Sequence, residues 1–136
     1  MAGNIRLEVV TPEASVVSED AQIVVGPGTL GEFGILIGHT PFLTTLKLGT
    51  LRYKDANGVE KFVFISAGFA EALPDKVTIL AESAERRRDI DMERVKQALK
   101  RAQERLASKK PDVDYERARA ALQRALYRIR LAETRS

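Results

Sequence analysis

The stretch Gly31-Glu32-Phe33-Gly34-Ile35-Leu36-Ile37-Gly38-His39-Thr40-Pro41-Phe42 combines three glycines and a proline with five large apolar residues. Glycine adopts positive φ without steric cost, so the three glycines permit sharp chain reversals. Pro41 biases the residue before it towards an extended conformation. The stretch therefore predicts short strands joined by tight turns, with Glu32 and His39 on an exposed rim. Four of its apolar side chains are expected in a core: Ile35, Leu36, Ile37 and Phe42.

Short apolar segments with turn signals between them lie on both sides of this stretch. Residues 5–9 alternate apolar and polar, the period of a half-buried strand. Further strands are expected at 16–17, 21–25, 42–46, 49–53, 61–65, 69–73 and 77–81, with turns at 18–20 and 26–28. Asn57-Gly58 is a strong hairpin signal between two of them. About eight to ten short strands at this spacing predict an all-β sandwich.

From Glu85 onward, apolar residues recur at helical spacing. The first apolar stripe contains Ile90, Val95, Leu99, Ala102 and Leu106, and the second contains Ala118, Ala121, Leu122, Ala125, Leu126, Ile129 and Ala132. Pro111 separates them, and Asp112 or Asp114 can cap the second helix. Narrow stripes predict a hairpin that is only marginally stable alone. The predicted fold is therefore α+β in two segregated parts: an N-terminal all-β sandwich over 1–84 and a C-terminal antiparallel α-helical hairpin over 85–136.

The net charge of the chain changes sign at the same boundary, after residue 84. Residues 1–84 hold six Lys+Arg and ten Asp+Glu, a net −4, whereas residues 85–136 hold sixteen and nine, a net +7. The two parts are therefore expected to face different partners. Three successive arginines, Arg86, Arg87 and Arg88, are expected at the hinge between them, where like charges disfavour compaction.

Composition argues against several classes of protein. The absence of cysteine excludes disulfides and thiolate metal sites. The N-terminus has no basic-then-apolar signal pattern, and the most apolar stretch, 62–73, is too short to span a bilayer. Membrane association is thus expected only through a partner. His39 is the only histidine and has no adjacent nucleophile, and 26–28 lacks the remainder of a P-loop. We therefore expect no catalytic residues, no metal site and no required cofactor.

The order of these segments resembles the epsilon subunit of the rotary proton-translocating ATP synthase, of bacterial type. The opening stretch carries the resemblance together with the motifs at 66–71 and 75–81, and the likeness covers the whole chain. It implies a non-catalytic subunit of the central rotor, on the cytoplasmic face of the plasma membrane. The sandwich would bind the gamma subunit and the ring of c subunits. The helices would act as a brake, either folded on the sandwich or extended along gamma into the alpha/beta catalytic hexamer, where they block ATP hydrolysis.

The resemblance also assigns site residues. Residues 90–95 resemble a motif through which some bacterial epsilon subunits bind ATP between folded helices, although Val95 stands where that motif has alanine. On a helical wheel Arg101 shares an arc with Asp91 and Arg94, and Arg124 and Arg128, four residues apart, flank the second stripe. A weak regulatory ATP site is therefore expected from Glu85, Asp91, Arg94, Arg101, Arg124 and Arg128. Val95→Ala is expected to bind ATP more tightly. Glu32 and His39 are expected to contact the c ring or gamma. The alternative for the helices is a solvated basic face with an acidic cap, and for His39 a plain turn residue.

A basic helical hairpin also attracts nucleic acid, which makes a nucleic-acid-binding protein the alternative function. Tyr115 and Tyr127 are the only aromatic residues after Glu85, however, and no recognition motif or stacking platform accompanies them. The sequence therefore favours a protein partner for the hairpin over nucleic acid.

Overall fold

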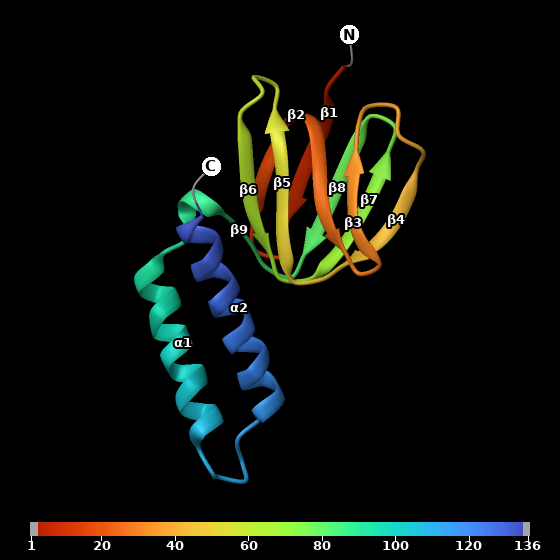
Figure 1. Cartoon of the computed structure of the whole chain (residues 1–136). Helices are drawn as coiled ribbons and strands as arrows, with labels where there is room; N and C mark the ends of the chain where they lie inside the picture. Colours follow the sequence, from red (N-terminus) through yellow and green to blue (C-terminus); the bar gives the residue numbers. More distant parts are fainter. Residues whose placement is uncertain (1–2, 135–136) are drawn as a thin grey trace. The chain divides into compact units, whose positions relative to one another are not determined.

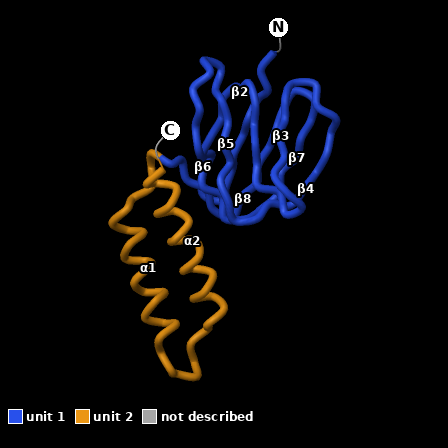
Figure 2. The backbone as a smooth tube through the Cα atoms, in the orientation of Figure 1, with its two compact units in different colours: residues 1–87 blue, residues 88–136 orange. Residues whose placement is uncertain are grey.

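The computed structural model describes residues 3–134 and contains two compact units, residues 1–87 and residues 88–136 (Figures 1 and 2). Residues 1–2 and 135–136, at the outer ends of the two predicted domains, lie outside the described residues. The first unit is built from β-strands and the second from two α-helices. This is the predicted class: a sandwich followed by a helical hairpin.

Unit 1 contains nine strands within the part of the chain that the structure describes. They are β1 (Ile5–Val10), β2 (Ser15–Gly28), β3 (Gly31–Ile35), β4 (Phe42–Leu46), β5 (Gly49–Asp55), β6 (Glu60–Ile65), β7 (Gly68–Leu73), β8 (Lys76–Ala81) and β9 (Ala84–Arg86). Hydrogen-bonded neighbours follow the order β1-β8-β7-β4-β2-β5-β6-β9, while β3 pairs with β2 and β1 also pairs with β2. Because β2 pairs with β1 in its first half and with β3 and β5 in its second, it passes between the two layers of the sandwich.

Alternate residues of the strands fill one core between the layers. The largest fully buried side chains include Tyr53, Ile5, Leu7, Ile35, Leu51, Ile65 and Ile79. The stretch from Gly31 to Phe42 is anchored as predicted at Ile35, and Ile37 and Phe42 pack against the core from its edge. The expectation for Leu36 is wrong, since 54% of this residue is exposed. It directly follows buried Ile35 at the end of β3, so the alternation of a strand turns it outward.

Two further details of the sandwich differ from the sequence predictions. The expected turns at 18–20 and 26–28 are parts of β2, which is continuous over 14 residues. The pairing of β2 with β5 shifts register between Ala21 and Ile23, but the strand is not interrupted there. The chain also does not become helical at Glu85, because Ala84–Arg86 form β9 and pair with β6. The first unit consequently extends to residue 87, three residues beyond the predicted boundary.

A short 3-10 helix, η1 (Arg87–Asp89), leads into unit 2, which consists of α1 (Met92–Ala107) and α2 (Tyr115–Glu133). Asp114 caps α2, where its side chain accepts a hydrogen bond from the backbone N–H of Arg117 at 3.1 Å. In the loop between the helices, the hydroxyl of Tyr115 donates to the carbonyl oxygens of Ser108 and Lys110. This contact ties the start of α2 to the end of α1.

Few helical residues are buried, and most of those are small. They are Val95, Ala102, Ala118, Ala125 and Leu131. Four of them lie on the predicted stripes, whereas Leu131 does not, and Leu126 was expected inside but is 43% exposed. The helices are therefore amphipathic in the predicted sense, with α2 presenting a partly different face.

Candidate functional site

The predicted regulatory residues occupy three different elements. Glu85 lies in β9 of unit 1, opposite Phe64 of β6. Asp91 immediately precedes α1, Arg94 and Arg101 lie within α1, and Arg124 and Arg128 lie within α2. Because the helices run antiparallel in the hairpin (Figure 1), the start of α1 is at the same end as the finish of α2. Arg94 and Arg128 therefore lie at one end of the hairpin, and Arg101 and Arg124 lie nearer its middle.

Asp91 has a structural role at this end of the hairpin. It is the N-cap of α1, and its carboxylate accepts a hydrogen bond from the backbone N–H of Arg94 at 3.2 Å. This contact satisfies an N–H group that has no partner inside the helix. Asp91 thus fixes the first turn of α1, the turn that carries Arg94. Val95, the next residue, is buried rather than pointing into solvent.

The arginines differ in exposure. Arg94 and Arg101 are exposed, whereas Arg124 and Arg128 are half-buried. Guanidinium groups on two adjacent helices can engage an anion with paired N–H donors. This arrangement is chemically suited to the phosphates of a nucleotide.

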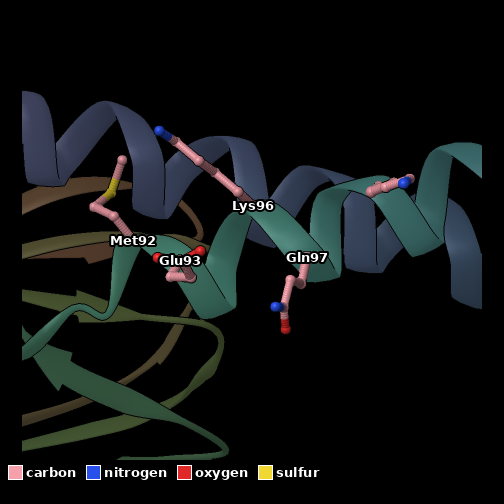
Figure 3. A pocket seen from close by; sticks show the side chains of 5 residues that line it. Met92, Glu93, Lys96 and Gln97 are labelled. Carbon is pink, nitrogen blue, oxygen red and sulfur yellow. The ribbon is translucent and has the colours of Figure 1, made fainter.

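A hollow of about 360 Å³ lies along α1 and is lined by Met92, Glu93, Lys96, Gln97 and Lys100. All five lining residues come from one helix, and none is a predicted site residue. In Figure 3, Lys96 and Gln97 point to opposite sides of α1, so these side chains do not converge on a common centre. The hollow is a feature of the helix surface and adds nothing to the regulatory site.

The second candidate site is the rim of the sandwich. Glu32, in β3, is paired with Arg52 of β5 at 2.9 Å, and both side chains are exposed. His39 lies in the loop that follows β3, where its Nδ1 contacts the carbonyl oxygen of Thr40. The Phe42 ring packs edge-on against both His39, at 5.0 Å between ring centroids, and Phe33, at 5.5 Å. These aromatic contacts hold the rim on the core.

An apolar outer face, which the sequence analysis did not identify, lies on β4, β7 and β8. We define it by Leu43, Phe69, Leu73 and Leu80, which are 71, 52, 40 and 54% exposed. The strand register places Phe69 beside Leu80, and places Glu71, two residues along the same face, beside Leu43. The signal was available, because Leu80 follows buried Ile79 and Phe69 precedes buried Ala70. Apolar residues in both phases of a strand predict two covered faces, not one.

A cluster of polar side chains lies between β2, β5, β6 and β9. Glu19 accepts hydrogen bonds from the Tyr53 hydroxyl at 2.8 Å and from Lys61 Nζ at 3.0 Å, and Arg86 approaches the same carboxylate at 3.4 Å. Burial raises the pKa of Glu19, but the bonds from Tyr53 and Lys61 outweigh that effect and leave its pKa lowered. Burial, together with the bond to Glu19, raises the pKa of the Tyr53 hydroxyl.

Two features are absent from residues 3–134. No helix within this range is both long and apolar enough to cross a membrane. The same range holds no group of three or more histidine, aspartate or glutamate side chains arranged to bind a metal ion.

Two protein-family models together match almost the whole chain. Residues 4–87 match the model described as ATP synthase, Delta/Epsilon chain, beta-sandwich domain. Residues 88–133 match the model described as ATP synthase, Delta/Epsilon chain, long alpha-helix domain. The two matched ranges meet at residue 87, where the two compact units also meet.

Individual relatives are similar over the same length. The ATP synthase epsilon chain of Desulfatibacillum aliphaticivorans is 65% identical over 136 residues, which span all of this chain and 96% of the relative. That of Desulforapulum autotrophicum is 61% identical over 135 residues, covering 99% and 100%. Among solved structures, a chain of the Euglena gracilis mitochondrial ATP synthase OSCP/F1/c-ring assembly superimposes with a TM-score of 0.71 at 25% identity, covering 88% of this chain and 76% of that chain.

Proposed function

This chain belongs to the family of ATP synthase delta/epsilon chains, and we propose that its two units divide assembly from regulation. As an epsilon subunit it is a central-stalk component and not a catalytic subunit of the complex. The proposal assigns binding of the gamma subunit and the c ring to the sandwich. It assigns inhibition of ATP hydrolysis to the helices. The chain would lie peripherally at the cytoplasmic face of a bacterial plasma membrane, held there by the complex, with no active site of its own.

The observation that carries the assembly role is the apolar outer face. Four large apolar residues gathered on three adjacent strands are costly to leave in water, and such patches on soluble proteins are typical of partner surfaces. A well-ordered sheet also presents them on a rigid surface, so binding orders few side chains. We assign this face to the gamma subunit. The rim with Glu32 and His39 would contact the c ring or gamma, and the exposed turn residue Leu30 lies two positions from Glu32.

Co-purification tests this assignment. The full chain, carrying an affinity tag, is mixed with the gamma subunit of the same organism and recovered on a column. We expect a stoichiometric complex that persists in 0.5 M salt, because apolar contacts are not screened by ions. Recovery of the chain alone would contradict the assembly role. Recovery with generic DNA in place of gamma would favour the nucleic-acid alternative, which no observed feature other than the basic charge supports.

A brake is supported by the small number of buried residues in the two helices. Three of the five buried residues are alanines, which contribute little burial energy each. A hairpin held so weakly can occupy two arrangements a few kcal/mol apart, and a partner can select one of them. The net +7 after residue 84 would favour docking on acidic segments of the alpha/beta hexamer. Inhibition should therefore weaken as salt is raised while the complex stays intact. Inhibition that is independent of salt would contradict an electrostatic brake.

ATP is the proposed regulatory ligand of the folded hairpin. Arg94, Arg101, Arg124 and Arg128 would engage its phosphates, while Asp91 positions the first turn of α1. A ligand at ten times its dissociation constant stabilises the bound form by about 1.4 kcal/mol. This is enough to shift a marginal hairpin towards the uninhibited form.

Calorimetric titration of the full chain with ATP tests the site. We expect weak binding by the wild type and tenfold or greater loss in Arg94→Ala and Arg128→Ala. Arg119→Ala is the matched control, since residue 119 lies about 180° around α2 from residue 128 at 100° per residue. Equal heats from all four proteins, or none below about 10 mM ATP, would leave a plain basic face.

The burial of Val95 adds a competing effect to the expected benefit of Val95→Ala. Removing two methyl groups from a buried position costs the hairpin about 1–2 kcal/mol. Relief of crowding at the nucleotide would gain about 1–3 kcal/mol. Titrating this variant with ATP while monitoring helix content by circular dichroism separates the two effects, because only the first lowers helix content without ligand.

A further inference from the structure

The last strand of the sandwich, β9, has only three residues, yet it precedes the unit proposed to move. Three-residue edge strands are weakly held by backbone pairing alone. In β9 the pairs are Ala84 with Ile65, Glu85 with Phe64, and Arg86 with Val63. Contacts other than these backbone pairs are therefore needed to hold residues 84–86 in the sheet when the helical unit moves.

Side chains hold β9 at both ends. Before the strand, the backbone N–H of Ser83 donates to the hydroxyl of buried Ser66 at 3.0 Å, and the N–H of Ser66 donates to the carbonyl of Ser83 at 3.1 Å. At the other end, Arg86 reaches across the sandwich edge to the first half of β2. Its Nε donates to the carbonyl oxygen of Val16 at 3.1 Å.

The Arg86 guanidinium also joins the polar cluster around Glu19. It lies 3.4 Å from the Glu19 carboxylate and 3.4 Å from the Tyr53 hydroxyl. Its side chain is 19% exposed and that of Glu19 is 25% exposed. Removing one partner of a partly buried charge pair leaves the other charge without compensation, and this destabilises the fold. Arg86 therefore links β9 to β2 and β5, which are not its ladder neighbours.

The three successive arginines consequently have different environments. Arg86 is held in the polar cluster, and Arg87 lies over the ring of Phe62 at 4.3 Å. Arg88 is 73% exposed and its distance to Asp89 is 3.9 Å. The step from held to exposed side chains occurs between residues 87 and 88, which is also the boundary between the compact units.

We propose that Arg86 is an anchor that keeps β9 in the sheet. The tether, which is the segment between β9 and α1 that leads to the helical unit, therefore begins only after Arg87. Releasing β9 would add three residues, or about 10 Å of reach, to this tether. A longer tether lowers the effective concentration of the helices at any surface that a short tether places within reach. Arg86 is thus a positioning residue for the brake. Only this last step rests on the proposed function.

Hydrogen exchange on the full chain tests the anchor directly. In Arg86→Met we expect the amides of residues 84–86 to exchange at least tenfold faster, while those of β1 and β8 change less than twofold. Arg86→Lys should show an intermediate effect, and Arg88→Met, the matched control, should show none. Protection of β9 that stays within twofold in Arg86→Met would overturn the anchor, and so would equal acceleration of all strands. If Arg86→Met does not fold, Glu19→Gln removes the charge from the other side of the contact and should speed exchange at residues 84–86 more than in β8, although β5 and β6 also lose a contact.

ATP hydrolysis by the assembled complex tests the tether. Arg86→Met should relieve inhibition at least twofold, Arg86→Lys should restore part of it, and insertion of Gly-Ser-Gly after Arg88 in the wild type should reproduce the relief. Full inhibition by Arg86→Met or by the insertion, in a complex that is activated by removing residues 88–136, would overturn the tether. If removing residues 88–136 also leaves hydrolysis unchanged, the brake itself is wrong, whereas the exchange experiment still decides the anchor.

Discussion

Replacing Phe69 and Leu80 together with serine should weaken binding of the gamma subunit by about 10- to 150-fold. The two residues are directly opposite in the pairing of β7 with β8, and they are 52% and 54% exposed. Fully burying a side chain of this size contributes about 1.5–3 kcal/mol. Covering the exposed half of each therefore contributes about 0.75–1.5 kcal/mol, or about 1.5–3 kcal/mol for the pair. Since 1.4 kcal/mol corresponds to a tenfold change in dissociation constant, the stated loss follows.

The assay is titration of gamma with the full chain by calorimetry or surface binding. Val59→Ser is the control, because Val59 is similarly exposed, at 53%, but lies outside the apolar outer face, next to the β5–β6 turn. It should bind within twofold of the wild type. The thermal unfolding midpoint of the double variant should stay close to that of the wild type, since both replaced side chains point away from the core. A double variant that is folded and binds gamma within threefold of the wild type would refute the assignment of this face.

Three further predictions concern the stability of each unit. The lowered pKa values of Glu19 and Asp55 mean that both carboxylates stabilise the sandwich above about pH 4.5 and 3.8, their ordinary values, and that this contribution is lost as pH falls through the lowered values. Urea unfolding at pH 7 and pH 3 should show this loss, and Glu19→Gln with Asp55→Asn should flatten it. Gly68→Ala should destabilise the sandwich by more than about 3 kcal/mol, since φ is 151° there and a Cβ would lie 1.9 Å from the carbonyl oxygen of Leu80; normal unfolding of this variant would contradict the strand geometry. Tyr115→Phe removes the hydroxyl that donates to Ser108 and Lys110 and should destabilise the hairpin by about 0.5–1.5 kcal/mol, seen as faster proteolysis within residues 108–114; an unchanged cleavage rate would show that the loop does not depend on this contact.

Local sequence signals predicted most of the strands and both helices. Asn57-Gly58 marks the β5–β6 hairpin, and Gly58 has the positive φ that such a turn requires. Asp114 caps α2, one of two candidates that the sequence left open. These features depend on residues within a few positions of one another, so their physics is visible in a short window of sequence.

The failures come from pairing between distant segments. Residues 18–20 and 26–28 have turn composition, but β1, β3, β4 and β5 supply partners along the whole of β2 and keep it extended. Residues 85–86 were predicted to belong to the helical part, but their pairing with β6 and the contacts of Arg86 with Glu19 hold them in the sheet. Leu36 was expected inside because single-residue hydrophobicity does not reveal which face a strand end presents.

The candidate sites could be predicted only in part. The motif at 90–95 named Asp91 and Arg94, and helical spacing added Arg101, Arg124 and Arg128. The structure shows that Asp91 is a helix cap. The apolar outer face was missed, because Leu43, Phe69 and Leu80 read as ordinary strand residues until the register places them on adjacent strands. The anchoring role of Arg86 had no sequence signal, since its partners lie 33 to 70 positions away in the sequence.

The division of labour between the two units is tested most directly by a chain that ends after Arg87. This chain retains all nine described strands, including β9 and the Arg86 contacts, and lacks both helices. It is compared with the full chain for binding to gamma and for ATP hydrolysis by the reconstituted complex. We predict that the truncated chain binds gamma within threefold of the full chain. Hydrolysis should rise severalfold and should no longer increase when salt is raised. Loss of gamma binding by the folded truncated chain, or hydrolysis unchanged from that with the full chain, would contradict the account.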